Sequence, residues 1–495
     1  MPNTRSNTMP TNADTLIRNA YLITMDDERR VYTDGFVAFT DGRISTVGPM
    51  SACNILAKET IDANGSVVMP GFVNTHNHLM QVALRGFNDD RWPVLDLPAA
   101  VRVLLHLLYS MAGRMDEERS YLLSRLHALD MIKSGYTATH DEHFTNVRKD
   151  SVDGSWRAIE ESGMRGFLAR CIVNGERVPD EGAETVAEGM PEVERLRNRF
   201  SSSRIEVVPG ILNFHFLKDP EDMRRIREGA DAIGSRLDVD MTDNSRGATL
   251  KARGFAGGQV DYYRHYGVMD GSIYAGKAHA LQAHEYDILA KHDARLSMVP
   301  MLRFFDGYGL PLHHFFARGI VPGIGTDAPL VTDCQSPFEM MRHTILAQNV
   351  AVKREKAEGI APPVEALWAT SEKVLEMATR AGSRTLFMDE EAGSLEVGKA
   401  ADCVIIDLSR AETQPAHANH RLIGLLVWSA AAANVDTVFV EGKKLLEKGR
   451  STIWDEDVVI SEAAQALADI AAETGIDSTF SDRRPGKTFR GWTYL

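Results

Sequence analysis

Short apolar runs alternate with helical stretches through the middle of the chain. From about residue 70 to residue 390, eight runs have the length of strands, and stretches with helical spacing separate most of them. The runs cover residues 67–78, 136–143, 165–173, 205–215, 236–244, 273–281, 294–302 and 319–328. Eight strands alternating with helices predict an α/β fold, a parallel sheet closed into a (β/α)₈ TIM-type barrel. A doubly wound open sheet is the alternative, but no GxGxxG motif follows the first strand.

The two ends of the chain have a different pattern. Residues 15–70 contain short strands and a hairpin that turns at Asp41-Gly42, and residues 401–409 and 435–449 repeat this pattern with a Glu-Gly turn. We expect both ends to meet as one small β-sandwich domain, residues 15–70 plus 395–450, beside a barrel of residues 71–394. Residues 451–495 complete the chain as a C-terminal helix and a basic, aromatic tail.

Composition excludes several classes of protein. The 495 residues are too many for one ordinary compact domain, and 44% hydrophobic with 25% charged residues is typical of a globular protein. The net charge of −14 is spread along the chain without a basic cluster, which argues against a nucleic-acid partner. We find no apolar run that would cross a bilayer, and the polar residues 1–14 lack a signal-peptide core, so we expect a cytoplasmic protein without a membrane partner. Four scattered cysteines, without a CxxC pair, predict neither a disulfide framework nor a thiolate metal site.

Candidate chemistry lies at the carboxyl ends of the predicted strands, where TIM barrels carry their active sites. The first run ends in His76-Asn77-His78, and strand alternation points both imidazoles to one spot. The last run ends in Gly325-Thr326-Asp327, whose carboxylate can bind an ion and accept a proton from water. Alone, the histidine pair is as often incidental, and Asp327 could be a helix N-cap. The strand context favours a metal site, and His279 on the sixth run would converge on the same mouth.

Several motifs together resemble the amidohydrolase superfamily. They are the Pro-Gly-Phe turn and HxH of "VVMPGFVNTHNHLMQVALRG", the aspartate of "GIGTDAP", and the Gly-Ser-Leu run of "EEAGSLEVGKAADCVIIDLS". The resemblance covers roughly residues 15 to 450. The branch it indicates contains guanine, 8-oxoguanine and cytosine deaminases and triazine hydrolases, and Gln81 and Arg85 are similar to the 8-oxoguanine deaminase and hydroxyatrazine hydrolase pattern. It implies one metal ion and an activated water that attacks a ring carbon carrying a leaving group.

The chain departs from that branch after the fifth strand. Relatives have His-x-x-Glu, in which the histidine binds metal and the glutamate moves a proton to the leaving group. In "LDVDMTDN", Asp240 stands at the histidine position and Asp243 at the glutamate position. A carboxylate can fill either role, although it favours harder metals. Met298 replaces a histidine that often contacts substrate, and the fourth strand lacks the lysine of binuclear relatives, because Lys218 comes too late.

Other polar side chains are open alternatives for a lost ligand or contact. The second strand offers His140, Asp141, Glu142 and His143, and the fourth offers Asn213 and His215. For any single one of them, a solvated loop residue is the better explanation.

These patterns predict a metal-dependent hydrolase that cleaves a C–N bond, by deamination or aminohydrolysis, in a small cyclic or aromatic substrate. We expect one divalent ion, zinc with iron or manganese as alternatives, and a homo-oligomer. The predicted metal ligands are His76, His78, Asp240 and Asp327. His279 and Asp327 are expected to orient and deprotonate the water, and Asp243 to protonate the leaving group. The predicted substrate contacts are Gln81, Arg85, His143, Asn213 and His215.

Two rival functions stay open. One is another reaction on the same scaffold: amide, urea or carbamate hydrolysis, dechlorination or decarboxylation. The other is a metal-free, non-catalytic relative that kept the barrel for assembly. The intact HxH, His279 and Asp327 argue against the second rival, because a scaffold needs none of them.

Overall fold

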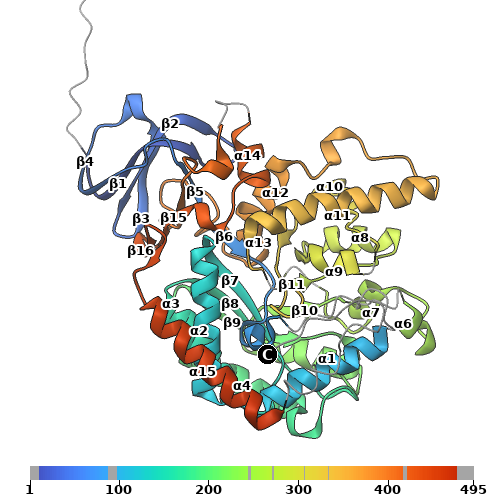
Figure 1. Cartoon of the computed structure of the whole chain (residues 1–495). Coiled ribbons are helices and arrows are strands. Elements are labelled where there is room, and N and C mark those ends of the chain that lie inside the picture. Colours follow the sequence, from blue (N-terminus) through green and yellow to red (C-terminus); the bar gives the residue numbers. More distant parts are fainter. Residues whose placement is uncertain are drawn as a thin grey trace, which may run out of the picture.

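A computed structural model describes residues 11–86, 97–242, 247–269, 272–305, 307–332, 334–415 and 421–475 of the chain. Its centre is a sheet of eight parallel strands (Figure 1). In sheet order these are β13 (Gly323–Ile324), β12 (Arg295–Met298), β11 (Ile273–Gly276), β10 (Leu237–Asp240), β9 (Ile205–Ile211), β8 (Arg165–Cys171), β7 (Tyr136–His143) and β6 (Phe72–Asn74).

Two hydrogen bonds join the first and last strands of this sheet. The amide of Thr75 donates to the carbonyl of Ile324 over 3.1 Å, and the amide of Asp327 donates to the carbonyl of His76 over 2.9 Å. The predicted (β/α)₈ barrel is therefore confirmed. Most strands are shorter than the runs that predict them, and the remaining residues leave the sheet as loops at the carboxyl end, which is the functional end of such barrels.

Helices follow most of the strands and cover the barrel. They are α1 (Leu97–Ala112), α2 (Glu117–Lys133), α3 (Ser151–Ser162), α4 (Val186–Arg199), α5 (Glu221–Ala232), α6 (Ala248–Ala252), α7 (Gln259–His265), α8 (Ala283–Lys291), α9 (Pro300–Phe305), α10 (Leu312–Phe316), α11 (Pro337–Ala357), α12 (Ser371–Ala378), α13 (Arg380–Thr385) and α14 (Leu422–Trp428). Polar N-caps begin several of them; Asp116, for example, accepts the amide of Arg119 at the start of α2 over 2.9 Å.

The two ends of the chain form a second sheet beside the barrel (Figure 1). Its strands are β17 (Arg450–Ser451), β16 (Lys443–Glu447), β15 (Val435–Val440), β14 (Cys403–Ile406), β5 (Val67–Pro70), β1 (Thr11–Ile23), β2 (Val31–Thr40) and β3 (Arg43–Pro49), with β4 (Ile55–Asp62) paired to β1. Asp41-Gly42 forms the turn of the β2–β3 hairpin, and Glu441-Gly442 forms the turn of the β15–β16 hairpin. All four residues have positive φ angles, as two-residue turns between twisted strands require. The domain limits at residues 70/71 and 394/395 stay a prediction.

The first predicted run, 67–78, is divided between the two sheets. Residues Val67–Pro70 are β5, which pairs antiparallel with β14, whereas Phe72–Asn74 are β6, which pairs parallel with β7. Gly71 lies between them, and a Cβ atom there would be only 2.1 Å from Cγ2 of Thr137. Only glycine allows the chain to pass this close to β7 while it changes sheets.

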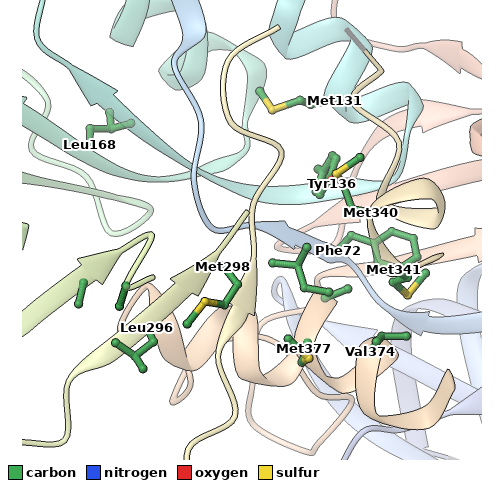
Figure 2. Close-up of a cluster of buried hydrophobic side chains, with 14 of the residues drawn as sticks. Phe72, Met131, Tyr136, Leu168, Leu296, Met298, Met340, Met341, Val374 and Met377 are labelled. Atoms are coloured by element: carbon green, nitrogen blue, oxygen red, sulfur yellow. The ribbon is translucent and has the colours of Figure 1, made fainter. Parts of the chain in front are cut away.

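A large apolar core packs helices against the barrel strands (Figure 2). Phe72 of β6 contacts Phe338 of α11 edge-on, with the ring centroids 5.2 Å apart. Met298 is fully buried in the same core. At this position the chain therefore carries a packing side chain where relatives often carry a histidine.

The C-terminal helix α15 (Glu456–Thr474) lies along α2 (Figure 1). Arg119 of α2 pairs with Glu473 over 2.6 Å, and Lys133 pairs with Glu456 over 2.9 Å. The basic, aromatic tail lies outside the described residues. Within the described part of the chain, no helix combines the length and the apolarity that crossing a bilayer would take.

We expect the buried ion pair between the two sheets to stabilise the fold. Arg165 of β8 contacts Asp402, next to β14, with Nε and Oδ2 2.6 Å apart and both side chains at most 3% exposed. Arg165→Met should lower the free energy of unfolding by about 3–5 kcal/mol, because it leaves a buried carboxylate unpaired. Urea denaturation measures this loss. Arg148→Met, which removes an exposed pair with Asp150, is the control and should cost about 1 kcal/mol or less; equal losses would contradict the prediction.

Candidate metal centre

Side chains from four strands, β6, β7, β10 and β13, meet at the mouth of the barrel. His76 and His78 follow β6, and Asp327 follows β13; all three are at most 5% exposed. One ligand atom from each lies within 4.8 Å of the others. His76, Glu142 and Asp240 form a second group by the same measure. The mouth therefore gathers imidazole and carboxylate groups, which are the usual ligands of zinc and other divalent ions.

Hydrogen bonds of the chain itself fix which nitrogen of His76 faces the mouth. The hydroxyl of Tyr274 donates to the carbonyl of Thr75 over 2.7 Å, so its oxygen must accept the Nδ1 hydrogen of His76, 2.9 Å away. Nε2 of His76 then carries a lone pair, and within the described residues it has no hydrogen-bond partner. Burial, reinforced by the nearby Lys277, holds the pKa of His76 well below its usual range. His76 is therefore neutral and ready to act as a ligand.

His78 is oriented in the same way by the neighbouring strand. Its Nδ1 lies 2.7 Å from the backbone carbonyl of Glu142 on β7, and a carbonyl can only accept. Nε2 of His78 is thus the free nitrogen, and it lies 3.4 Å from Oδ1 of Asp327. Two ligands placed about 2.0–2.1 Å from a tetrahedral ion would lie about 3.3 Å apart, so this spacing suits a shared ion.

Asp327 has a strained backbone that aims its carboxylate into the mouth. Its φ is +63°, and Oδ1 accepts the amide of Ala328 over 2.7 Å. Burial acts to raise the pKa of Asp327, but Lys277 and His78 outweigh it and hold that pKa well below the usual range. Gly325 lets this turn pass over His76, since a Cβ atom there would be 2.6 Å from the His76 amide nitrogen.

Lys277 is a cation in the mouth that the sequence analysis missed. It follows β11 with a φ of +49°, and its Nζ lies 2.8 Å from Oδ2 of Asp240 and 3.5 Å from Oδ2 of Asp327. Burial acts to lower the pKa of Lys277, but Asp240 and Asp327 outweigh it and raise that pKa, so the ammonium stays charged. The signal was present in the sequence: Lys277 comes directly after the sixth strand, two residues before His279.

Glu142 enters the mouth from β7. Strand alternation places His140 and Glu142 on the lumen face, and His140 pairs with Asp238 over 2.6 Å. Oε2 of Glu142 lies 3.8 Å from Nε2 of both His76 and His78. Burial, reinforced by the carboxylates of Asp240 and Asp238, raises the pKa of Glu142 well above its usual range.

The residues present fit a divalent cation. Asp238 lies 2.6 Å from Nε2 of His140, and Asp240 is paired with Lys277, so Glu142 and Asp327 are the carboxylates that lie beside the imidazoles of His76 and His78. Both oxygens of Glu142 and Nε2 of His76 have no hydrogen-bond partner in the described part of the chain. A dication placed among these atoms would supply the missing partner and the missing charge together.

Other predicted site residues make contacts of their own outside the group of candidate ligands. His143 is on the opposite face of β7 and contacts Ser151 of α3 over 3.2 Å, and burial lowers the pKa of His143 to about 3. Arg85 pairs with Asp130 of α2 over 2.7 Å. Asn213 accepts the amide of His215 over 2.9 Å as a local cap. The structure therefore shows local contacts for these four residues, and their predicted roles as substrate contacts stay predictions.

Two further predicted residues lie nearer the centre. His279 is buried, Nε2 has no hydrogen-bond partner in the described residues, and burial together with the nearby cations Arg303 and Lys277 lowers its pKa well below the usual range. Gln81 is buried in the turn after His78. Asp243 lies outside the described residues. The predicted roles of all three residues stay predictions.

Comparisons with known proteins agree on one family. The family model described as "Amidohydrolase family" matches residues 67–445. The 5'-deoxyadenosine deaminase of Methanosarcina acetivorans is 28% identical over 93% of this chain and 99% of its own length. The 5-methylthioadenosine/S-adenosylhomocysteine deaminase of Desulforudis audaxviator is 29% identical over 90% of this chain and 97% of its own.

Solved structures share the fold. The structure of an adenosine deaminase from Xanthomonas campestris with bound zinc has a TM-score of 0.81 at 22% identity, over 94% of this chain and 100% of that one. An atrazine chlorohydrolase from Arthrobacter aurescens, complexed with zinc, has a TM-score of 0.80 at 20% identity, over 92% and 100%.

We expect Tyr274 to control metal affinity without touching the metal. Tyr274→Phe removes the acceptor that fixes the tautomer of His76, so affinity for a divalent ion should fall roughly 10- to 100-fold. Chelator competition measures the change. Tyr109→Phe is the matched control, because Tyr109 is also buried but its hydroxyl has no hydrogen-bond partner within the described residues. Unchanged affinity in Tyr274→Phe would show that packing alone holds His76.

Proposed function

Because the chain belongs to the amidohydrolase family and is a hydrolase of carbon–nitrogen bonds, we propose that it is a metal-dependent deaminase with one divalent ion per chain. The substrate we propose is a purine nucleoside or a related amino-substituted heterocycle, since the relatives named above are deaminases of adenosine derivatives. Zinc is the ion we propose first, with iron or manganese as alternatives.

One observation carries this proposal. The free Nε2 atoms of His76 and His78 and the carboxylate of Asp327 converge from the first and last strands of the barrel. Hydrogen bonds to Tyr274 and to the carbonyl of Glu142 fix the two rings in that orientation before any ligand binds. A protein that used the barrel only for assembly would gain nothing from this arrangement.

The residues of the mouth divide the work. A divalent ion held by His76, His78 and Asp327 would supply Lewis acidity and a water of lowered pKa. Asp327 is ionised and accepts the proton of the attacking water on the oxygen that faces the mouth. Lys277 holds Asp327 in its charged form from 3.5 Å away. His279 orients the water, and Asp243 passes the proton to the leaving amine, as the sequence predicts.

A second candidate keeps the metal and changes the leaving group. Asp240, which is paired with Lys277, stands at the position where the resemblance to the family predicts a ligand histidine. Asp243 stands at the position of the usual glutamate. Because the residues that relatives use for the metal and for the leaving group are altered here, the second candidate is a substrate whose leaving group differs from ammonia, such as a substituted amine or a halide. We further propose a homo-oligomer in the cytoplasm, as composition and the sequence indicate.

Metal content and ammonia release test the proposal together. Freshly purified protein should carry about one equivalent of a divalent ion and release ammonia from at least one compound of a screen of purine nucleosides, pterins and triazines. His76→Ala should lose both metal and turnover, because it removes a buried ligand, while circular dichroism shows an intact fold. Arg148→Met, far out on the surface, should retain both.

Each result has a distinct meaning. Two tightly held ions would contradict the single-ion site. One ion with release of halide or alkylamine, and never ammonia, would support the second candidate in place of the first. Full turnover after complete metal removal would overturn both.

A further inference from the structure

Two carboxylates compete for the fourth position around the proposed ion. Asp240 is the residue that the sequence favours, because it stands where relatives carry a ligand histidine. Glu142 approaches the same point from β7. Both side chains are buried, so the difference between them lies in the partners that each one already has.

The carboxylate of Asp240 is fully engaged by its own surroundings. Oδ1 accepts the amide of Thr242 over 2.8 Å and the Thr242 hydroxyl over 2.6 Å. Oδ2 lies 2.8 Å from the ammonium of Lys277. A metal bond to Asp240 would have to displace or share a charged partner inside a buried site, which leaves the lysine without its nearest counter-ion.

Glu142 has the opposite character. Its side chain is 0% exposed, and neither carboxylate oxygen has a hydrogen-bond partner within the described residues. Oε2 instead lies equidistant, at 3.8 Å, from the free Nε2 atoms of His76 and His78. Burying a carboxylate without hydrogen-bond partners costs folding free energy. We therefore expect another group to bind the carboxylate of Glu142.

We propose that Glu142, and not Asp240, is the fourth ligand of the metal ion, together with His76, His78 and Asp327, and that Lys277 holds Asp240 out of the coordination sphere. The charges then balance in two sets. Glu142 and Asp327 neutralise the dication, and Lys277 neutralises Asp240. This inference rests on the proposed single-ion site and assigns its ligands.

The backbone of Glu142 supports the same assignment. Its amide donates to the carbonyl of Asn77 over 3.0 Å, and its carbonyl accepts from Nδ1 of His78. One residue of β7 therefore fixes the HxH segment through its main chain and reaches the proposed ion through its side chain. Asp141, the next residue on β7, faces outward and accepts from Trp156 over 2.8 Å, so only one acid of this segment enters the mouth.

Two isosteric substitutions decide between the carboxylates. Glu142→Gln and Asp240→Asn each remove one charge without changing shape, so each serves as the control for the other. Both are stripped and reloaded with Co²⁺ alone. The cobalt affinity of Glu142→Gln should fall by more than the roughly 100-fold that the loss of a residue orienting a ligand costs. Its cobalt absorption spectrum should also change. Asp240→Asn leaves Lys277 unpaired near the ion, so its cobalt affinity should fall, but less than that of Glu142→Gln, and its spectrum should stay unchanged because no ligand is lost.

The other outcomes overturn the inference. If Asp240→Asn loses cobalt and Glu142→Gln retains it, the sequence-based ligand set holds. If both lose cobalt and the spectrum of Asp240→Asn also changes, Lys277 does not keep Asp240 apart from the ion. If neither variant loses cobalt, the fourth ligand is another group. A wild type that binds no dication would overturn the proposed function itself. Should Glu142→Gln fail to fold, anomalous diffraction from cobalt-loaded wild type decides, because the ion should lie about 2.0–2.2 Å from a Glu142 oxygen and beyond bonding distance of Asp240.

Discussion

The mouth of the barrel is governed by the cost of burying charge. Glu142, Asp238, Asp240 and Asp327 are all at most 3% exposed, and an unbalanced carboxylate in such a place costs several kcal/mol. Lys277 forms an ion pair with Asp240, and His140 forms a hydrogen bond with Asp238. The remaining two lie beside the free nitrogens of His76 and His78. The hydrogen bonds and close backbone contacts around the mouth hold these carboxylates and imidazoles in place.

The barrel supplies the positions and the surrounding hydrogen bonds supply the orientations. Hydrogen bonds between the first and last strands bring His76 and Asp327 side by side. Gly325 lets those two segments approach closely enough, and Tyr274 fixes the imidazole of His76. His76, His140 and Tyr274 also stack on one another, with His140 and Tyr274 ring centroids 4.6 Å apart. The site is thus rigid before any ligand binds, which is the property that makes such centres effective.

The sequence predicts the fold well because hydrophobic periodicity determines it. Eight apolar runs became eight parallel strands, and both terminal hairpins turn at the predicted Asp41-Gly42 and Glu441-Gly442 positions. The run at 67–78 was harder, because a single glycine divides it between two sheets. No periodicity shows that division; it follows from the contact of Gly71 with Thr137, which is remote in sequence.

The site was predicted less completely, and for a physical reason. Motifs identify residues whose type is typical of a function, such as His76, His78 and Asp327. They do not show which way a side chain faces or what it already contacts. His143 and Glu142 are neighbours on one strand, yet one faces α3 and the other the lumen. Lys277 was missed because a lysine after a strand has no meaning until the carboxylates of two other strands are seen around it.

Asp240 of the fifth strand and Lys277 after the sixth strand are best understood as one unit. An aspartate at position 240 without a cation would be a buried, repelling charge beside Glu142 and Asp327. A lysine at position 277 without Asp240 would place a strong cation next to the proposed ion. Together they form a pair 2.8 Å apart that is neutral overall and closed to further ligands. The two residues therefore depend on each other, and the ion depends on their pairing, because an unpaired ammonium would repel it and an unpaired aspartate would compete for it. When the fifth strand no longer supplies a ligand, a carboxylate from another strand, such as Glu142 of β7, is expected to take its place.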